Sequence, residues 1–275
     1  MAIVAISRGT HNGADEMASR LSGQLGYPYV GREQLVAAAS TYYRIPLEEM
    51  QAAMDRRPSF WDRKLGAHIG FLPAMRATLA AQVSHDNLIY SGYAGHLLLP
   101  GIPHVLSVRV VADLEARAQA AMQREHISRA EALTRLESED RKRWEWVRFL
   151  FGVDWTDVGL YHLVVNVSRL SQEAACAAVA RLVECPEFQA TAASRKVLED
   201  LALYNRVLAA LALDFRTRDA HLKVTVDDGV VTVTGTTRWA EVAEAVPEVV
   251  RNVEGVKRAK TEITGGEPPV GITGY

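Results

Sequence analysis

The first 25 residues constrain the fold more than any other stretch of this chain. A short apolar run at 2–6 precedes a polar, glycine-containing turn at 7–13, and an amphipathic segment follows at 14–25. A strand, a loop and a helix in this order direct backbone N–H groups of the loop and of the helix N-terminus toward an anion. The pattern therefore predicts a phosphate-binding loop, although it lacks the lysine of G-x-x-x-x-G-K-[ST].

Length and composition set the broad class of the protein. A chain of 275 residues is long enough for two domains, and 48% hydrophobic with 23% charged residues is ordinary for a soluble globular protein. The net charge of -2 gives no overall field that would attract nucleic acid. No basic segment with an apolar core opens the chain, and no apolar run could span a bilayer. We expect a cytoplasmic protein with no transmembrane segment and no nucleic-acid partner.

The first part of the chain alternates strand and helix patterns. Four continuous apolar runs are typical of strands covered on both faces of a parallel sheet: residues 3–6, 88–91, 105–111 and 163–166. Helical patterns separate them, at 72–83, after the capping box that begins at Ser128, and after Ser171. Cys176 lies in an alanine-rich helical pattern, which favours a buried structural thiol. The sequence predicts a three-layer α/β domain over residues 1–185.

The pattern changes after Pro186. A helix at 197–213 is followed by two strands of alternating polarity that meet at the Asp-Asp-Gly turn of residues 227–229, and Gly235 is expected to end the second strand. A helix at 240–250 and a strand at 255–263 complete an α-β-β-α-β unit. We predict a linker at 186–195, a small α+β domain at 196–264 whose sheet is exposed on one face, and a loose tail at 265–275.

Several separated motifs, in the right order, resemble the cytidylate kinase-like family, a branch of the P-loop nucleoside monophosphate kinases. They lie at residues 3–8, 25–33, 92–96, 108–112, 140–143 and 163–171. The resemblance implies a parallel sheet of P-loop kinase type, a phosphate loop, a monophosphate-binding region and a lid. It also implies ATP with Mg²⁺ as the cofactor.

The C-terminal unit resembles the BON domain. The strand–turn–strand sequence at 226–235 and the Gly-Val turn at 253–257 carry this resemblance. That family is associated with envelope proteins and with proposed phospholipid or ligand binding. The resemblance implies a small-molecule or lipid ligand for this unit.

The loop supplies the nucleotide-binding candidates. They are Gly9, Thr10, His11, Asn12 and Gly13. The two glycines allow the backbone to approach a phosphate closely. The family has glycine, serine and glycine in this loop, and in this chain His11 and Asn12 occupy the first two of those places.

Two charged residues flank this loop. Arg8 is a candidate catalytic residue that could replace the missing lysine by bidentate bonding to phosphate, and the alternative is a surface arginine at a strand end. Ala14 occupies the lysine position, and Asp15 follows it where a serine or threonine is usual. Asp15 would repel phosphate unless it holds Mg²⁺, and the alternative is an acidic residue that complements the dipole of a first helical turn.

Two further positions correspond to the acceptor site of the family. Arg32 matches the arginine that binds the monophosphate, and the alternative is a solvated residue at a helix start. Tyr93 and Ala94 replace the Arg-Asp pair that helps to read the substrate. A tyrosine can stack on a base but cannot reproduce the arginine fork, so base specificity does not transfer. His96 is either a polar pocket residue or structural.

Three arginines match the lid segment. Arg141 and Arg143 are the catalytic candidates and Arg148 is a nucleotide-binding candidate. The alternative is a solvated helix with many salt bridges. Trp144 and Trp146 interleave with these arginines, which favours packing against the core or against a second subunit of a homo-oligomer.

Two functions remain open at this stage. One is an ATP-dependent kinase of a nucleoside monophosphate or related acceptor. The other is a catalytically impaired module that senses a nucleotide and is coupled to the ligand-binding C-terminal unit. The retained loop glycines and arginines favour the first, whereas the missing lysine and the acidic residue at position 15 favour the second.

Overall fold

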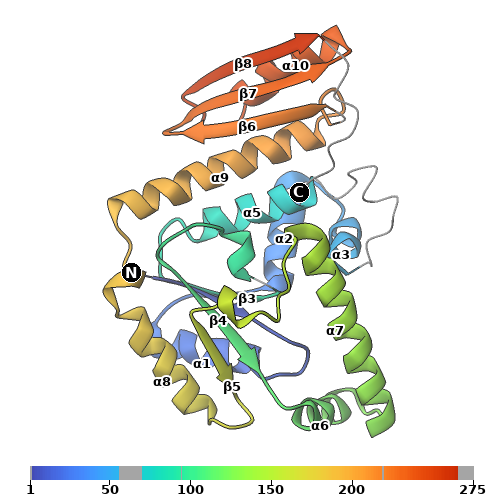
Figure 1. Ribbon diagram of the computed structural model, residues 1–275, viewed down its shortest axis with the longest axis vertical. Helices are drawn as coiled ribbons and strands as arrows, with labels where there is room; N and C mark the ends of the chain where they lie inside the picture. The colour runs from blue at the N-terminus through green and yellow to red at the C-terminus, as the bar shows by residue number, and fades with distance from the viewer. Residues whose placement is uncertain (1, 56–69, 94, 219, 266–275) are drawn as a thin grey trace. The chain divides into compact units, whose positions relative to one another are not determined.

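A computed structural model describes residues 2–55, 70–93, 95–218 and 220–265 (Figure 1). The chain divides into two compact units. Of the described residues, the first unit holds 2–55 and 85–194, and the second holds 70–84, which include helix α5 (Phe71–Gln82), and the chain from Arg195 onward. Ala94 and residues 266–275 of the expected tail lie outside the described residues.

The first unit contains a five-stranded sheet in the order β2-β3-β1-β4-β5, with every neighbouring pair parallel. The strands are β1 (Ile3–Ser7), β2 (Tyr29–Gly31), β3 (Leu88–Gly92), β4 (Val105–Val111) and β5 (Leu163–Asn166). The parallel α/β fold predicted from the sequence is confirmed. The three-residue strand β2 is additional, because so short a segment carries no periodic signal.

Burial explains why these segments form strands. All five residues of β1 and of β3 are buried, whereas β5 at the sheet edge is only partly covered. Helices α1 (Ala14–Leu25) and α8 (Gln172–Val183) pack together on one face of the sheet and contribute to its main core. Cys176 is buried in this core, as predicted. Helix α2 (Arg32–Tyr43) contacts β2 and β3.

Three helices of the first unit form a group, in which two of them pack against the third. Helix α6 (Leu114–Glu125) packs on α7 (Arg129–Phe151), and α3 (Leu47–Asp55) also contacts α7. The capping box predicted at Ser128 is confirmed, because its hydroxyl accepts from the Glu131 N–H while the Glu131 carboxylate accepts from the Ser128 N–H. Trp146 is buried, and its indole donates to the Ala53 carbonyl, so this tryptophan packs in the core.

The second unit confirms the α-β-β-α-β prediction. Its elements after α5 are α9 (Ala192–Leu213), β6 (His221–Asp227), β7 (Val230–Thr237), α10 (Ala240–Arg251) and β8 (Arg258–Gly265). The sheet order is β6-β7-β8, with β7 antiparallel to β6 and parallel to β8. Asp228 and Gly229 have φ of 46° and 77°, which is the turn predicted between β6 and β7.

Two boundaries differ from the sequence prediction. Strand β7 continues through Gly235 to Thr237, because this glycine permits a close approach: a Cβ there would lie 2.6 Å from the His221 carbonyl oxygen. Helix α9 begins at Ala192, inside the segment expected as a linker, where Thr191 and Ser194 exchange hydrogen bonds that cap the helix. A short 3-10 turn at Pro186–Phe188 precedes it.

Across the described residues, none of the helices combines the length and the apolar character needed to cross a membrane.

Candidate functional site

The loop between β1 and α1 has a left-handed backbone conformation at two positions. His11 and Gly13 have φ of 53° and 76°, which is the left-handed region, and α1 begins at Ala14 directly after them. A Cβ at Gly13 would lie 2.8 Å from Nε2 of Gln172, whose amide donates to the Gly13 carbonyl at 3.2 Å. The positive φ favours glycine here, whereas the close contact is with the end of the Gln172 side chain, which can move.

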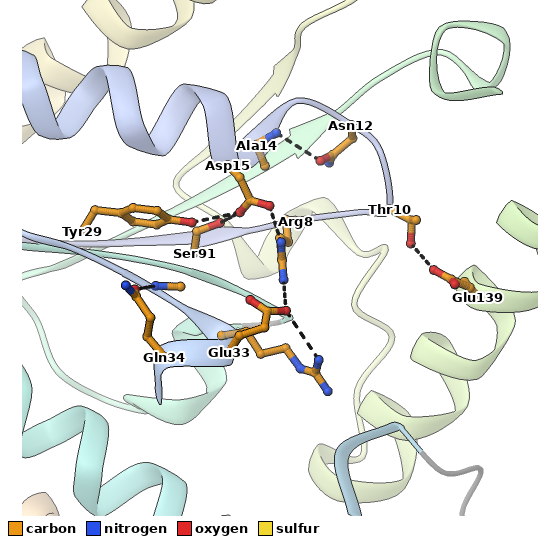
Figure 2. Close-up of polar contacts among 12 residues, drawn as sticks. Arg8, Thr10, Asn12, Ala14, Asp15, Tyr29, Glu33, Gln34, Ser91 and Glu139 are labelled. Atoms are coloured by element: carbon orange, nitrogen blue, oxygen red, sulfur yellow. Dashed lines mark hydrogen bonds and ion pairs between the residues drawn. The ribbon is translucent and has the colours of Figure 1, made fainter. Parts of the chain in front are cut away.

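Asn12 holds the loop from inside. Its side chain is buried, and Nδ2 donates to the Val110 carbonyl of β4 at 2.6 Å. Its Oδ1 accepts from the Ala14 N–H at 3.3 Å, as Figure 2 shows. The first N–H of α1 is thus satisfied by a loop side chain, in the position where the sequence pattern expects a ligand phosphate to accept.

Thr10 and His11 connect the loop to the two helices that follow β4. The Thr10 hydroxyl donates to Glu139 Oε2 at 3.0 Å, and it accepts from Arg143 Nη2 at 2.7 Å. His11 Nε2 lies 2.9 Å from Glu125 Oε1. The position of the loop is therefore coupled to the position of α6 and α7.

Arg8 and Asp15 form an ion pair at the two ends of the loop (Figure 2). Oδ1 of Asp15 also accepts from the Tyr29 hydroxyl at 3.1 Å and from the Ser91 hydroxyl at 2.9 Å. Arg8 donates its other terminal nitrogen to Glu33 Oε1 at 2.7 Å. Burial alone would lower the pKa of Arg8, but the two carboxylates raise it above its usual value. Burial, with the Asp15 charge, raises the pKa of Tyr29 to about 12, so it stays a donor.

Three predicted arginines converge on Tyr93. The guanidinium carbon lies 3.8 Å from the ring centroid for Arg143, 4.8 Å for Arg32 and 5.6 Å for Arg8. Arg32 is buried at the first position of α2, so the alternative of a solvated residue does not hold. The face of one aromatic ring thus offsets part of the repulsion among three like charges.

Arg143 is the most informative of these residues. Its side chain is only 4% exposed, and its Nε and Nη1 atoms are buried with no hydrogen-bond partner among the described residues. Its closest carboxylate is that of Asp140, at 3.7 Å from Nη1. Beyond the Thr10 hydrogen bond and the Asp140 ion pair, this buried guanidinium therefore keeps two donor atoms that could bind a further partner.

Arg143 lines a cavity of about 170 Å³ directly over the loop. The other lining residues are Arg8, Gly9, Thr10, His11, Asn12, Gly13, Ala14, Asp15, Glu16, Tyr93 and Arg124. The structure therefore brings together the predicted loop residues with Arg8, Tyr93 and Arg143. Arg32 joins them through the Tyr93 ring.

Arg141 and Arg148 lie elsewhere. Arg141 is exposed, donates to Glu137 at 2.9 Å, and lines a second cavity of about 450 Å³. Gly9 and Asn12 line both cavities, and Trp144 and Trp155 line the larger one. Arg148 stacks on the Trp144 ring with its guanidinium carbon 4.9 Å from the centroid. The three lid arginines thus have three different environments.

Sequence reasoning did not assign roles to several residues of this region. Arg117 donates to the Thr10 carbonyl at 2.9 Å and binds Asp140 through two hydrogen bonds of 2.8 Å. Arg109 donates to the Trp155 carbonyl at 2.6 Å and stacks on the Trp155 ring. Arg109 lies in β4 and Arg117 in α6, and neither segment has a sequence motif that points to the loop. Only the fold brings these two side chains to it.

Asp15 is a poor fit to the magnesium role considered from the sequence. Its Oδ1 accepts two hydrogen bonds, and its Oδ2 faces the Arg8 guanidinium. Among the described residues, no three His, Cys, Asp or Glu side chains gather as a metal site. Mg²⁺ needs near-octahedral oxygen ligands, and a cation at Asp15 would have to displace Arg8.

The fold and the loop together define the class of protein: a parallel α/β domain of the phosphate-loop kinase type, joined to a small α+β domain. Residues 3–169 match the sequence model of the cytidylate kinase-like family, and residues 199–265 match that of the BON domain. The chain belongs to the cytidylate kinase-like family, and its C-terminal unit is a BON domain. Both resemblances inferred from sequence motifs are confirmed.

Known proteins with similar sequences agree with this assignment. A cytidylate kinase of Ignicoccus hospitalis is 24% identical over 183 residues, which cover 66% of this chain and 99% of that protein. A cytidylate kinase of Methanopyrus kandleri is 28% identical over 167 residues, which cover 59% and 82%. An uncharacterized protein from Eubacterium ventriosum has a similar fold, with a TM-score of 0.52 at 16% identity over 67% of this chain and 99% of that one.

Proposed function

We propose that this protein binds the phosphate groups of a nucleotide in the cavity over the loop at residues 8–15. The observation that carries the proposal is Arg143, which lines this cavity and whose buried Nε and Nη1 atoms have no hydrogen-bond partner among the described residues. The loop glycines and the position of the loop before the N-terminus of α1 support it, because a helix N-terminus favours an anion. The similarity to cytidylate kinases makes a nucleotide the first ligand class to test.

Four of the predicted arginines have a place in this proposal. Arg8 and Arg143 neutralise phosphate charge, and Arg32 anchors an acceptor phosphate beside Tyr93. Arg141 contacts ligand atoms that extend into the larger cavity, which meets the smaller one at Gly9. Arginine suits these roles because its fork bonds phosphate oxygens in pairs.

Phosphoryl transfer to a nucleoside monophosphate or related acceptor is the enzymatic form of this function, with ATP as the donor. The convergence of three arginines on Tyr93 supports it, because such transfer depends on positioning and charge neutralisation. A catalytically impaired, nucleotide-sensing module is the alternative. It is favoured by Ala14 at the lysine position and by the ion pair that occupies Arg8.

A panel of nucleotides scored by thermal shift, with and without magnesium, tests the binding proposal. A ligand that binds the native state raises the unfolding midpoint by mass action, whether or not catalysis survives. We expect a rise for at least one nucleotide, and a smaller rise for the Arg143→Met variant. A panel with no rise in either buffer would contradict nucleotide binding.

A coupled assay with ATP and CMP separates the enzymatic form from the impaired one. We expect weak or no turnover, since losing one well-placed electrostatic stabiliser costs about two to three decades of rate. Rapid phosphorylation of CMP by the unmodified protein would instead establish the enzymatic form.

The BON domain is proposed to bind a small-molecule or lipid ligand. Phe215 and Trp239 of this unit are large apolar side chains that are 78% and 67% exposed, so they are the side chains to test for contact with such a ligand. Co-sedimentation with liposomes tests a lipid ligand, and loss of binding in the Trp239→Ser variant is the expected result. A homo-oligomer remains a prediction, which sedimentation velocity would test.

A further inference from the structure

We propose that the loop cavity binds the phosphate groups of its ligand as a free anion, with arginine guanidinium groups in the place of a divalent cation. This inference rests on the proposed nucleotide binding at the same site. Two observations support it: the carboxylates around the loop already have ion-pair or hydrogen-bond partners, and some guanidinium N–H groups have no hydrogen-bond partner among the described residues.

The first step is that both oxygens of the Asp15 carboxylate already have partners. Its carboxylate is 45% exposed, so access to solvent would not exclude a metal ion. A metal ion would have to compete with the groups that already bind this carboxylate. The hydroxyls of Tyr29 and Ser91 donate to Oδ1, and Arg8 donates to Oδ2. A magnesium ion bound there would have to release a buried arginine from its principal partner.

The second step concerns the other carboxylates near the loop. Glu33 pairs with Arg8 at 2.7 Å and lies 3.7 Å from Arg32. Glu125 pairs with His11 and Arg135, and Glu139 accepts from the Thr10 hydroxyl. Glu16, which also lines the cavity, pairs with Arg20 at 3.0 Å. Each of these four acidic groups therefore already neutralises a cation or accepts a loop donor.

The third step is the surplus of guanidinium donors. Nε of Arg8 and both Nε and Nη1 of Arg143 are buried without a hydrogen-bond partner in the part of the chain that the structure describes. The exposed Arg124 lines the same cavity. A phosphate in the cavity would bind these guanidinium groups directly, since guanidinium–phosphate pairs form short, paired hydrogen bonds.

Calorimetric titration with ADP, once in EDTA and once in excess magnesium chloride, tests this inference. We expect the Kd in EDTA to be no more than about threefold weaker than the Kd in magnesium. A Kd that is more than about threefold weaker in EDTA would overturn the inference while leaving nucleotide binding intact. Absence of heat in both buffers together with no thermal shift for any nucleotide would overturn the proposed function itself, so the two failures are distinguishable.

The Asp15→Asn variant sharpens the result. Asparagine keeps an oxygen that can accept from Tyr29 and Ser91 but no longer pairs with Arg8. If the inference holds, this change frees Arg8 for phosphate, so the affinity for ADP rises in both buffers. If Asp15 holds magnesium, the affinity falls in the magnesium buffer only. The titration of the unmodified protein decides the question even if this variant does not fold.

Discussion

Arg143 differs from the preceding Arg141 and Lys142 on α7 in being buried, adjacent to Tyr93 and bonded to Thr10. We expect Arg143→Met to weaken nucleotide binding by about tenfold or more, because hydrogen bonds to charged groups contribute about 1.5–3 kcal/mol. Methionine keeps much of the apolar bulk, so the loss reports the charge. Calorimetry with the best ligand of the thermal-shift panel measures the effect.

Lys142→Met is the matched control for this change. Lys142 precedes Arg143 on the same helix and is exposed, so removal of its charge should leave the affinity nearly unchanged. Arg141→Met should have a smaller effect than Arg143→Met, since Arg141 is exposed and lines the larger cavity. Equal losses in the Lys142 and Arg143 variants would show that only net charge matters, and unchanged affinity in the Arg141 variant would remove Arg141 from the site.

His96 predicts a pH dependence of stability. It lies against the Tyr161 ring at 4.7 Å, and burial, with a smaller contribution from His162, lowers its pKa from 6.5 to about 4. The unfolded state therefore binds the proton more tightly. The neutral histidine leaves stability intact above pH 6.5, and stability falls as the pH drops toward 4, by about 3 kcal/mol from this group.

Urea unfolding of the unmodified protein and of His96→Gln, each between pH 7 and pH 4, measures this contribution. Glutamine cannot take up a proton, so we expect a flatter profile for the variant. Identical slopes in the two proteins would mean that His96 titrates normally in the folded state.

The loop as a structural element depends on Gly13. Gly13→Ala places a Cβ at φ 76° and 2.8 Å from the Gln172 amide. We expect a loss of about 1–2 kcal/mol of stability from the backbone conformation, together with weaker nucleotide binding. Chemical denaturation and calorimetry measure the two effects.

Gln172→Ala combined with Gly13→Ala separates the causes. The double variant removes the close contact and keeps the left-handed conformation. If its stability equals that of the Gln172→Ala protein, the backbone conformation costs nothing, and the loop does not need glycine for that reason.

The elements were largely predictable from the sequence because their signals are local. The capping box at Ser128 and the Asp-Asp-Gly turn lie where the pattern places them, and α1 spans the predicted residues. Helix α6 carried no comparable signal, since only Ala118 and Ala121 are buried along it. Small buried residues in a polar segment give little periodic contrast.

The site was predictable only in part. The loop residues follow from the order of strand, glycine and helix, but the choice of partners does not. From the sequence, Arg8 could bind either a phosphate or a carboxylate, and in the structure it forms ion pairs with Asp15 and Glu33. That choice depends on β3 lying beside β1, which brings Ser91 to the Asp15 carboxylate. Pairing between strands that are distant in sequence is not visible in a local pattern.

At the scale of the whole molecule, the two compact units make limited proteolysis informative. The prediction of separate domains at 1–185 and 196–264 places the sensitive segment before α9, where residues 184–191 contain only a short 3-10 turn. Helix α5 precedes this segment in sequence but belongs to the C-terminal unit, where Gly70 lies beside Ala212 and Leu213 of α9.

We therefore expect a nick at 184–191 to give two fragments that separate on a denaturing gel but elute together in native size-exclusion chromatography. Elution as separate folded pieces would show that α5 does not hold the fragments together. A chain that resists cleavage in this segment would count against two independent cores.

The place of β7 between an antiparallel and a parallel neighbour has a consequence for how the C-terminal unit assembles. The hairpin of β6 and β7 needs only its own turn, whereas β8 reaches β7 after α10 has crossed over. Until then, one side of β7 offers a row of unsatisfied amide and carbonyl groups beside the apolar Val231 and Val233. A chain cut short before Arg258 would keep that edge open permanently, and self-association through it would compete with the native fold.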